Sequence, residues 1–319
     1  MSRRPGGLPV IVIVGPTGVG KTDVALEVAK QLKGEALSAD SRQVYRNLRV
    51  GTAKPMGKWS ATKEGPRYIV KAVVHHLLDH VNPNETYTAG RFTREAKAVL
   101  NELSKRDVPA ILVGGTGMYI RSLVRGLALL PEGDAILRKE LAGQAEREGR
   151  TALHQELKKV DPVAAQAIPP NNIQRVIRAL EVYKITGRPL SSLQKEGTHP
   201  APWEFVWFGL QWDPGHYQER LAQRCRSMGE GIVAETKALL GMGVPPTAPA
   251  FQSLGYREAL AFVTGKSSKE AFEQDFYKQT ALYAKRQFTW FRGEPSIRWL
   301  TVQPSSSHKG LANQIISHL

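Results

Sequence analysis

The stretch GPTGVGKT at residues 15–22 constrains this chain most, because it matches the phosphate-binding pattern G-x-x-x-x-G-K-[ST] at every fixed position. The run VIVIV at residues 10–14 before it is β-branched, as in strands that are buried on both faces. Apolar residues at helical spacing follow the motif, with Lys33 in the last turn and Gly34 as the expected stop. We therefore predict a strand, a glycine-rich loop and a helix.

These neighbours favour a phosphate-binding loop (P-loop) over a chance glycine turn. The candidate phosphate-binding residues are Gly15, Pro16, Thr17, Gly18, Val19, Gly20, Lys21 and Thr22. In such a loop, backbone N–H groups and the helix N-terminus surround an anion. Lys21 can bridge phosphate oxygens, and the Thr22 hydroxyl can bind Mg²⁺. The loop thus predicts a polyphosphate ligand and a Mg²⁺ cofactor, without saying which polyphosphate.

Length and composition set the broader limits. A chain of 319 residues with 41% hydrophobic and 23% charged residues predicts a globular protein of one or two domains. Its single cysteine, Cys225, excludes an internal disulfide framework and a cysteine-based zinc site, and favours a cytoplasmic location. We expect neither membrane insertion nor secretion, since the chain lacks a run of about 18 apolar residues and its start lacks an apolar signal core.

The formal charge of +15 favours a polyanionic partner, with nucleic acid as the first candidate, over a protein that is merely cationic. Two segments could supply the contact. Arg175 and Arg178 lie opposite the apolar stripe of a predicted helix, and residues 283–292 interleave aromatic with basic side chains. A solvated face in the first case and inward-packed core aromatics in the second remain open alternatives.

Residues 35–40 read as a short strand that ends in the carboxylate of Asp40. Ligands of open parallel sheets bind beyond the carboxyl ends of the strands, which would place Asp40 near the phosphates. An aspartate that caps the next turn is an equal alternative. Residues 68–79 read as another strand; the adjacent His75 and His76 then point to opposite faces, so we expect structural histidines rather than a shared metal site.

The alternation of strands and helices stops near residue 131, and residues 134–187 are helical in pattern. A strand pattern returns at residues 204–212. We predict an α/β fold: a parallel sheet with flanking helices and an all-α insertion. Residues 1–125 and 201–319 would form the core, and residues 126–200 the insertion.

Eight motifs in this order closely resemble the tRNA dimethylallyltransferase family, over about residues 9–292. They are GPTGVGKT at 15–22, ADSRQVY at 39–45, GTAKP at 51–55, HHLLD at 75–79, VGGTG at 113–117, RALEVY at 178–183, LGYR at 254–257 and AKRQFTWF at 284–291. The resemblance implies a nucleotide-kinase-like fold. Its P-loop is of the ATP-binding type but would hold dimethylallyl diphosphate in place of ATP. It also implies transfer of the dimethylallyl group to N6 of adenosine 37 in tRNA, next to the anticodon.

The resemblance also implies the roles of individual residues. Asp40 would accept the N6 proton, and Thr17 would be a second catalytic group. Lys21, Mg²⁺ on Thr22 and loop N–H groups would stabilise the leaving diphosphate. The adenine would have to be flipped out of its stack to reach the crevice.

The remaining residues that the resemblance implies contact tRNA, and the insertion would bind the anticodon stem-loop. We also expect a monomer in the cytoplasm. They are Asp40, Ser41, Arg42, Gln43, Thr116, Arg138, Gln174, Arg175, Val176, Ile177, Arg178, Gln252, Gly255, Tyr256, Arg257, Lys285, Arg286, Gln287, Trp290 and Arg292. The chain departs from the family at Asp213-Pro214, where Asp-Arg is frequent, and at Ala281-Leu282, where Arg-Arg is usual. The lack of a zinc module is typical of the short bacterial form.

Three alternative functions share some of these features. An adenylate isopentenyltransferase would use the same donor on a free nucleotide, but the insertion and the charge favour tRNA. A P-loop small-molecule kinase would consume ATP without an isoprenoid. A non-catalytic RNA-binding protein would not need the intact Lys21, Thr22 and Asp40.

Overall fold

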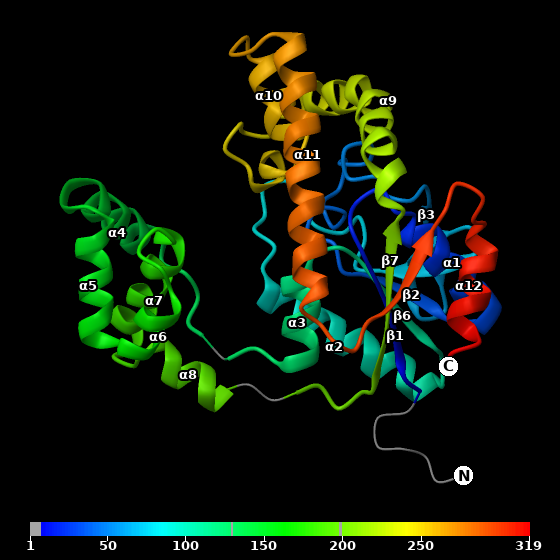
Figure 1. Ribbon diagram of the computed structural model, residues 1–319, viewed down its shortest axis with the longest axis horizontal. Coiled ribbons are helices and arrows are strands. Elements are labelled where there is room, and N and C mark those ends of the chain that lie inside the picture. Colours follow the sequence, from blue (N-terminus) through cyan, green and yellow to red (C-terminus); the bar gives the residue numbers. More distant parts are fainter. Residues whose placement is uncertain (1–7, 129, 198–199) are drawn as a thin grey trace. The chain divides into compact units, whose positions relative to one another are not determined.

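The computed structural model describes residues 8–128, 130–197 and 200–319, and it divides into two units, Met1–Val124 with Pro202–Leu319 and Arg125–Ala201. An eight-stranded sheet forms the centre of the described part of the first unit (Figure 1). Its strands are β1 (Val10–Val14), β2 (Glu35–Ser38), β3 (Lys58–Thr62), β4 (Gly65–Val70), β5 (Val73–His76), β6 (Ala110–Val113), β7 (Phe205–Trp212) and β8 (Arg298–Val302). Their order is β3-β4-β5-β2-β6-β1-β7-β8, and β5 through β8 in that order are parallel.

Helices cover both faces of this sheet and extend beyond the carboxyl ends of its strands (Figure 1). They are α1 (Lys21–Leu32), α2 (Ala89–Arg106), α3 (Gly117–Arg125), α9 (Pro214–Gly241), the 3₁₀ helix η1 (Pro249–Gln252), α10 (Tyr256–Val263), α11 (Lys269–Arg292) and α12 (His308–Ile316). The α/β fold predicted from the sequence is confirmed.

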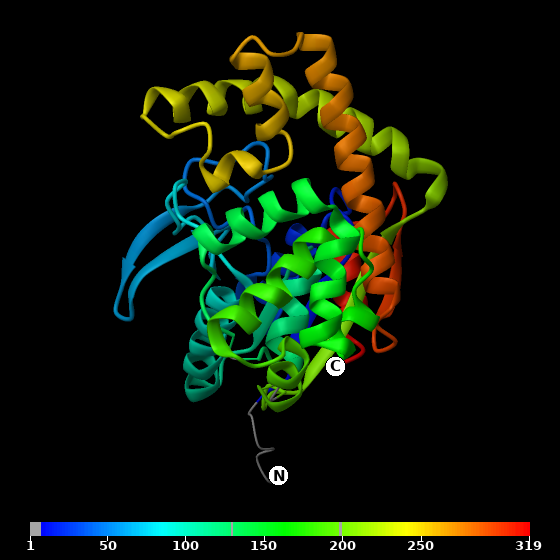
Figure 2. The same ribbon diagram turned by 90° about the vertical axis from the view of Figure 1, so that its left-hand side faces the viewer.

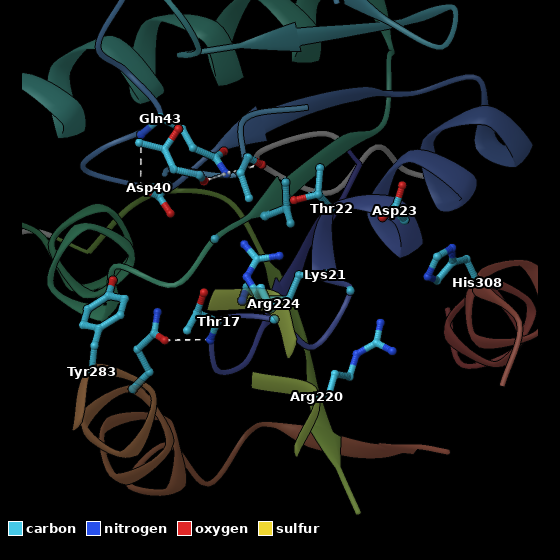
Figure 3. A pocket seen from close by; sticks show the side chains of 17 residues that line it. Thr17, Lys21, Thr22, Asp23, Asp40, Gln43, Arg220, Arg224, Tyr283 and His308 are labelled. Carbon is cyan, nitrogen blue, oxygen red and sulfur yellow. Dashed lines mark hydrogen bonds between the residues drawn. The ribbon is translucent and has the colours of Figure 1, made fainter. Parts of the chain in front are cut away.

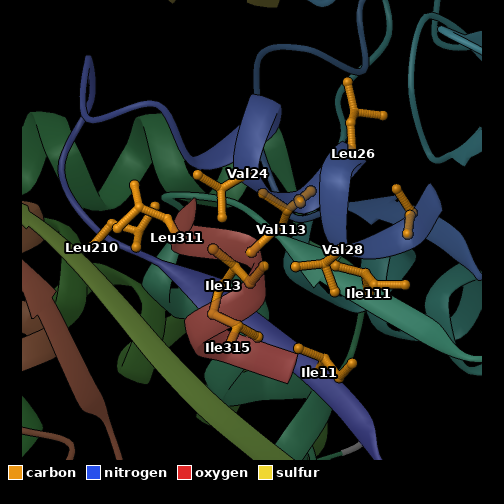
Figure 4. Packing of buried hydrophobic residues seen from close by; sticks show 14 of the residues in the cluster. Ile11, Ile13, Val24, Leu26, Val28, Ile111, Val113, Leu210, Leu311 and Ile315 are labelled. Atoms are coloured by element: carbon orange, nitrogen blue, oxygen red, sulfur yellow. The ribbon is translucent and has the colours of Figure 1, made fainter. Parts of the chain in front are cut away.

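The two faces follow from the period of two along a strand. Ile11 and Ile13 of β1 pack in the same core as Val24 and Val28 of α1 and Leu311 of α12 (Figure 4). Val10, the residue before Ile11, faces the other way, where it lines a small cavity with Leu100 and Leu103 of α2. β1 is therefore buried on both sides, as its uninterrupted β-branched sequence predicts.

The segment 68–79, expected to be one strand, instead contains a hairpin. Lys71 and Ala72 have left-handed φ angles of 47° and 67°, which reverse the chain between β4 and β5. β3 pairs antiparallel with β4, and Figure 2 shows the blue hairpin of β3 and β4 extending away from the rest of the sheet. The prediction failed because Lys-Ala is not a typical turn pair, so no turn residue marked the reversal.

The end of α1 also differs from the prediction. Lys33, with φ 53°, is the left-handed residue that ends the helix, and Gly34 follows it. A Cβ on Gly34 would lie 2.5 Å from the carbonyl oxygen of Pro109. Glycine is therefore required here by the close approach of the chain that leads into β6, and not by a positive φ.

The second unit is all-helical in its described residues. It contains α4 (Ala135–Glu148), α5 (Arg150–Val160), α6 (Pro162–Ala167), α7 (Ile173–Thr186) and α8 (Leu190–Gly197). Leu141, Leu153, Leu157, Val176 and Leu180 belong to its own hydrophobic core. Gly187, with φ 69°, ends α7, and Asn172 occupies the N-cap position without a side-chain cap hydrogen bond.

Among the described residues, no helix combines the length and the apolar character that crossing a membrane requires.

Candidate active site

The P-loop is shaped by three glycines at the carboxyl end of β1. Gly15, Gly18 and Gly20 have positive φ angles of 145°, 81° and 91°. A Cβ on Gly15 would lie 2.3 Å from the carbonyl oxygen of Leu210 in the neighbouring strand β7. Gly20 is the N-cap of α1, so the loop and the positive end of the helix dipole meet at one point. This arrangement favours a bound anion.

A cavity of about 220 Å³, called the phosphate cavity below, lies against this loop. Its lining residues come from distant parts of the first unit: Thr17, Gly18, Gly20, Lys21, Thr22, Asp23, Asp40, Gln43, Thr52, Ala53, Val113, Gly114, Arg220, Arg224, Tyr283, Gln287 and His308. Figure 3 shows Lys21 and Arg224 pointing into its centre, with Arg220 and His308 farther out. The predicted P-loop residues Thr17, Lys21 and Thr22 thus line one cavity.

Lys21 and Arg224 are the partly buried cations of the phosphate cavity, whereas Arg220 is exposed. Burial lowers the pKa of Lys21 to about 8, the charge of Asp40 opposes this change, and the charge of Arg224 adds to it. The pKa of Arg224 is also lowered, mainly by burial. The Lys21 ammonium donates to the carbonyl oxygen of Pro16 at 2.7 Å. Desolvation destabilises the charged forms of Lys21 and Arg224. A polyanionic ligand would stabilise these charges and offset their desolvation.

Asp40 lies beyond the end of β2 and lines the cavity opposite the P-loop (Figure 3). Its Oδ1 accepts hydrogen bonds from the N–H groups of Arg42 at 2.8 Å and Gln43 at 3.2 Å. Asp40 therefore both caps a turn and faces the cavity, so the two interpretations of the sequence are compatible. The turn fixes the carboxylate in place.

The VGGTG motif supports this placement. A Cβ on Gly114 would lie 2.2 Å from the carbonyl oxygen of Ala39, so glycine allows the two segments to touch. The N–H of Ala39 donates to Val113 at 2.8 Å, and the hydroxyl of Thr116 accepts from the N–H of Ser41 at 3.0 Å. Thr116, predicted to contact tRNA, thus holds the segment that carries Asp40.

The main chain of Thr17 is fixed by two helices. Its N–H donates to Oε1 of Gln287 in α11 at 2.8 Å, and its carbonyl accepts from the hydroxyl of Tyr217 in α9 at 2.9 Å. Gln287 also donates to the carbonyl oxygen of Gly115 at 2.9 Å. Gln287, predicted to contact tRNA, is only 5% exposed and is occupied by the P-loop in this structure.

A second cavity of about 350 Å³, called the base cavity below, adjoins the first. It is lined by Thr17, Asp40, Ser41, Arg42, Gly51, Thr52, Gln252, Ser253, Leu254, Arg257, Gln279, Tyr283 and Arg286. Both cavities have Thr17, Asp40, Thr52 and Tyr283 in their walls. A ligand on the P-loop and a ligand in the base cavity would meet at these four residues.

The loop that carries Thr52 is anchored from both ends. Gln43 donates its amide to the carbonyl oxygens of Thr52 at 3.1 Å and Ala53 at 3.3 Å. Glu235 of α9 accepts the N–H of Val50 at 3.0 Å and the hydroxyl of Tyr256. The contacts of Glu235 were not predicted, because this residue lies 185 residues from Val50 in the sequence.

The other predicted tRNA contacts of this unit fall into three groups. Ser41, Arg42, Gln252, Arg257 and Arg286 line the base cavity. Lys285, Trp290 and Arg292 of α11 are exposed. Gly255 and Tyr256, by contrast, act within the fold: Tyr256 is fully buried and donates to Glu235, and a Cβ on Gly255 would lie 2.9 Å from Phe276.

In the helical unit, Gln174 and Arg175 are exposed, whereas Val176 and Ile177 are buried in the core of the unit. The two remaining predicted contacts, Arg138 and Arg178, both bind the buried carboxylate of Glu181, at 2.9 and 2.5 Å. Arg178 also donates to the carbonyl oxygen of Pro131 at 2.7 Å. Arg178 therefore has a role inside the unit, whereas Arg175 has the exposure of a solvated or ligand-binding residue.

His75 and His76 of β5 are both buried. His76 lies 2.5 Å from Oε2 of Glu35, and His75 is buried, which lowers its pKa to about 3. Within the described residues, no group of three or more His, Cys, Asp or Glu side chains is placed to hold a metal ion.

Sequence reasoning missed the role of Arg220, Arg224 and His308. Arg220 and Arg224 stand four residues apart, a spacing that places them on the same face of a helix. The signal that was available is the strand before them, since β7 pairs with β1 and so delivers α9 to the P-loop. His308 had no local signal, because it reaches the cavity from the start of α12.

The chain is similar to known proteins over most of its length. Residues 43–294 match the family described as IPP transferase, and residues 8–71 match the family described as isopentenyl transferase. The tRNA dimethylallyltransferase of Thermomicrobium roseum is 41% identical over 96% of this chain and 90% of its own length. That of Geobacter sulfurreducens is 39% identical over 94% of each chain.

Solved structures give the same result. The tRNA isopentenylpyrophosphate transferase of Bacillus halodurans is 34% identical and has a TM-score of 0.67, with 97% of this chain and 96% of the other covered. A eukaryotic dimethylallyltransferase solved in the course of acting on tRNA is 26% identical and has a TM-score of 0.75, with 96% and 76% covered. The chain belongs to the tRNA dimethylallyltransferase family.

Proposed function

We propose that this protein transfers the dimethylallyl group of dimethylallyl diphosphate to N6 of adenosine 37 in tRNA, next to the anticodon. The observation that carries the proposal is the meeting of two cavities at Thr17, Asp40, Thr52 and Tyr283. One cavity has a P-loop and buried cations for a diphosphate. The other is lined by polar and basic residues suited to a flipped nucleotide.

The diphosphate binds with its phosphates against the N-terminus of α1, Lys21 and Arg224. These groups stabilise the negative charge that develops on the diphosphate as it leaves. Arg220 and His308 border the outer part of the same cavity and add donors there. The allylic carbon then lies at the end of the phosphate cavity that faces Asp40.

The chemical step exchanges one bond for another. The lone pair of N6 forms a bond to C1 of the donor, while the electron pair of the C1–O bond leaves with the diphosphate. The N6 proton passes to the carboxylate of Asp40, which is the general base. Thr17 lies beside the same junction and positions the departing oxygen, because its main chain is fixed by Gln287 and Tyr217.

Mg²⁺ fits the donors present in the phosphate cavity. The Thr22 hydroxyl is an oxygen ligand of the kind that Mg²⁺ prefers. Because the described residues lack a cluster of three His, Cys, Asp or Glu side chains, its other ligands would be diphosphate oxygens and water. When bound, Mg²⁺ neutralises part of the diphosphate charge.

The helical unit and the exposed basic residues of α11 would bind the anticodon stem-loop. Arg175, Lys285, Arg286 and Arg292 are placed on surfaces of their own units where phosphates can reach them. The net charge of +15 supports this binding. The protein would act on tRNA in the cytoplasm, as a monomer.

The test is incubation of the protein with labelled dimethylallyl diphosphate and an anticodon stem-loop, followed by nucleoside analysis. We expect N6-dimethylallyladenosine at the position next to the anticodon, and loss of transfer in a chelator. A stem-loop in which this adenosine is replaced by guanosine is the control. Efficient labelling of AMP with none of the stem-loop, or ATP consumption without isoprenoid, would overturn the proposal.

A further inference from the structure

Tyr283 is the one aromatic residue among the four that line both cavities. Thr17, Asp40 and Thr52 offer hydroxyl, carboxylate and methyl groups, whereas Tyr283 offers the face or edge of a large ring. Figure 3 shows the ring of Tyr283 at the cavity wall, on the same side as Asp40. Among the described lining residues, the other aromatic group is His308, which lies by Gly20 at the P-loop end.

The ring is held at a fixed distance from the P-loop. Tyr283 and Gln287 are one turn apart in α11 and so share a face of the helix. Gln287 binds the N–H of Thr17 at 2.8 Å, which ties the P-loop to this face. At the other end of the ring, the phenol lies close enough to Thr116 for that side chain to lower the pKa of the phenol.

The phenol is a neutral group in this position. Burial raises the pKa of Tyr283 well above its ordinary value, and the charge of Asp40 raises it further. The side chain is therefore unsuited to accept the N6 proton. What it brings to the junction of the two cavities is an uncharged aromatic ring, whose face attracts positive charge.

We infer that Tyr283 is a catalytic residue whose ring stabilises the positive charge that develops on the dimethylallyl group during transfer. The inference rests on the proposed function. As the C1–O bond breaks and its electron pair leaves with the diphosphate, positive charge grows on the allyl carbons before the N6 lone pair completes the new bond. These carbons lie between the two cavities, where Tyr283 is the large apolar surface.

This stabilisation increases as the charge grows, so it acts mainly on the transition state and raises kcat more than it lowers KM. The electron density of the π face determines the strength of this interaction. Fluorine atoms withdraw electron density from the π face, so each added fluorine should weaken the interaction while it leaves the shape of the ring nearly unchanged.

The experiment measures single-turnover transfer to the stem-loop by full-length variants. Tyr283→Phe keeps the ring and removes only the phenol oxygen, for which we expect a fall of about fivefold or less. Tyr283→Leu keeps apolar volume and loses the π face, for which we expect a fall of roughly 10- to 30-fold. Tyr277→Leu, on the same helix but outside both cavities, is the matched control and should keep the wild-type rate.

The decisive series places phenylalanine with one, two or three ring fluorines at position 283. We expect the logarithm of the rate to fall with each fluorine while the KM for the donor changes little. A flat series, or a leucine variant as fast as Tyr283→Phe, would overturn the inference even though wild-type transfer is normal. If the wild-type protein transfers nothing to the stem-loop, the proposed function fails, and the inference fails with it.

Discussion

The two units use a carboxylate in opposite ways. In the sheet-containing unit, Asp40 accepts two backbone N–H groups on one oxygen and faces a cavity. In the helical unit, Glu181 is 0% exposed, binds Arg138 and Arg178, and accepts the N–H of Asp134 at 2.7 Å. The charge of Asp40 is thus available to a ligand, whereas that of Glu181 is neutralised within the fold.

The cations differ in the same way. Lys21 and Arg224 line the phosphate cavity, and desolvation lowers the pKa of each. Arg178 keeps a carboxylate partner at 2.5 Å, although its side chain is 28% exposed. A charged residue in one of the sequence motifs can therefore bind a ligand or stabilise the fold. Its partner in the folded protein distinguishes the two roles.

The largest effect should come from Asp40→Asn, which keeps an oxygen for the turn and removes the charge. We expect the single-turnover rate to fall by roughly 10²- to 10⁴-fold, as for the loss of a general base, while affinity for the stem-loop changes little. Asp275→Asn, at an exposed position of α11, is the control. An unchanged rate in Asp40→Asn would remove the contrast with Glu181.

Glu181→Gln should act on stability instead. It leaves two arginines without their buried partner, and we expect a loss of about 3 kcal/mol, at the low end for such a pair because Arg138 is half exposed. Urea unfolding measures the loss, with exposed Glu140→Gln in α4 as the control. Transfer at saturating stem-loop should stay near the wild-type rate. A large fall in rate with normal stability would contradict the structural role.

Glu95 of α2 tests whether the sheet-containing unit also holds a carboxylate for stability alone. Burial would raise its pKa, but hydrogen bonds from His80, Tyr87 and Arg91 lower it to about 2. Because the folded-state pKa is depressed, its contribution is complete above about pH 4.5 and is lost as the pH falls towards 2. We expect Glu95→Gln to cost about 2 kcal/mol at pH 7.

The measurement is the free energy of unfolding of wild type and Glu95→Gln between pH 7 and 2. The difference between them should be constant above about pH 4.5 and shrink below it. Exposed Glu219→Gln is the control. A difference that grows on acidification would show that another group dominates.

The smallest effect should come from Arg175→Ala. We expect weaker binding of the stem-loop, a salt dependence whose slope falls by about 1, and unchanged stability. Arg178→Ala, three residues along α7, is the matched comparison and should lower stability as well because it breaks the bond to Glu181. An unaltered slope in Arg175→Ala would assign that residue to a solvated face.

Much of the fold was predictable because its signals are local. The β-branched run before the P-loop, the helical stripe of α2 and the shift to helices after residue 131 each follow from spacing within a short window. The hairpin between β4 and β5 was not, because Lys71 and Ala72 adopt left-handed conformations that neither residue type favours.

The sequence alone determined the strand, loop and helix around the P-loop, because glycine, lysine and threonine at fixed spacing require that local geometry. The tertiary structure decided which residues surround the ligand. Gln287 reaches Thr17 across 270 residues, and Tyr283, Arg224 and His308 arrive from three separate helices. Such contacts depend on how buried helix faces pack on a sheet, and the spacing within one segment does not report on that packing.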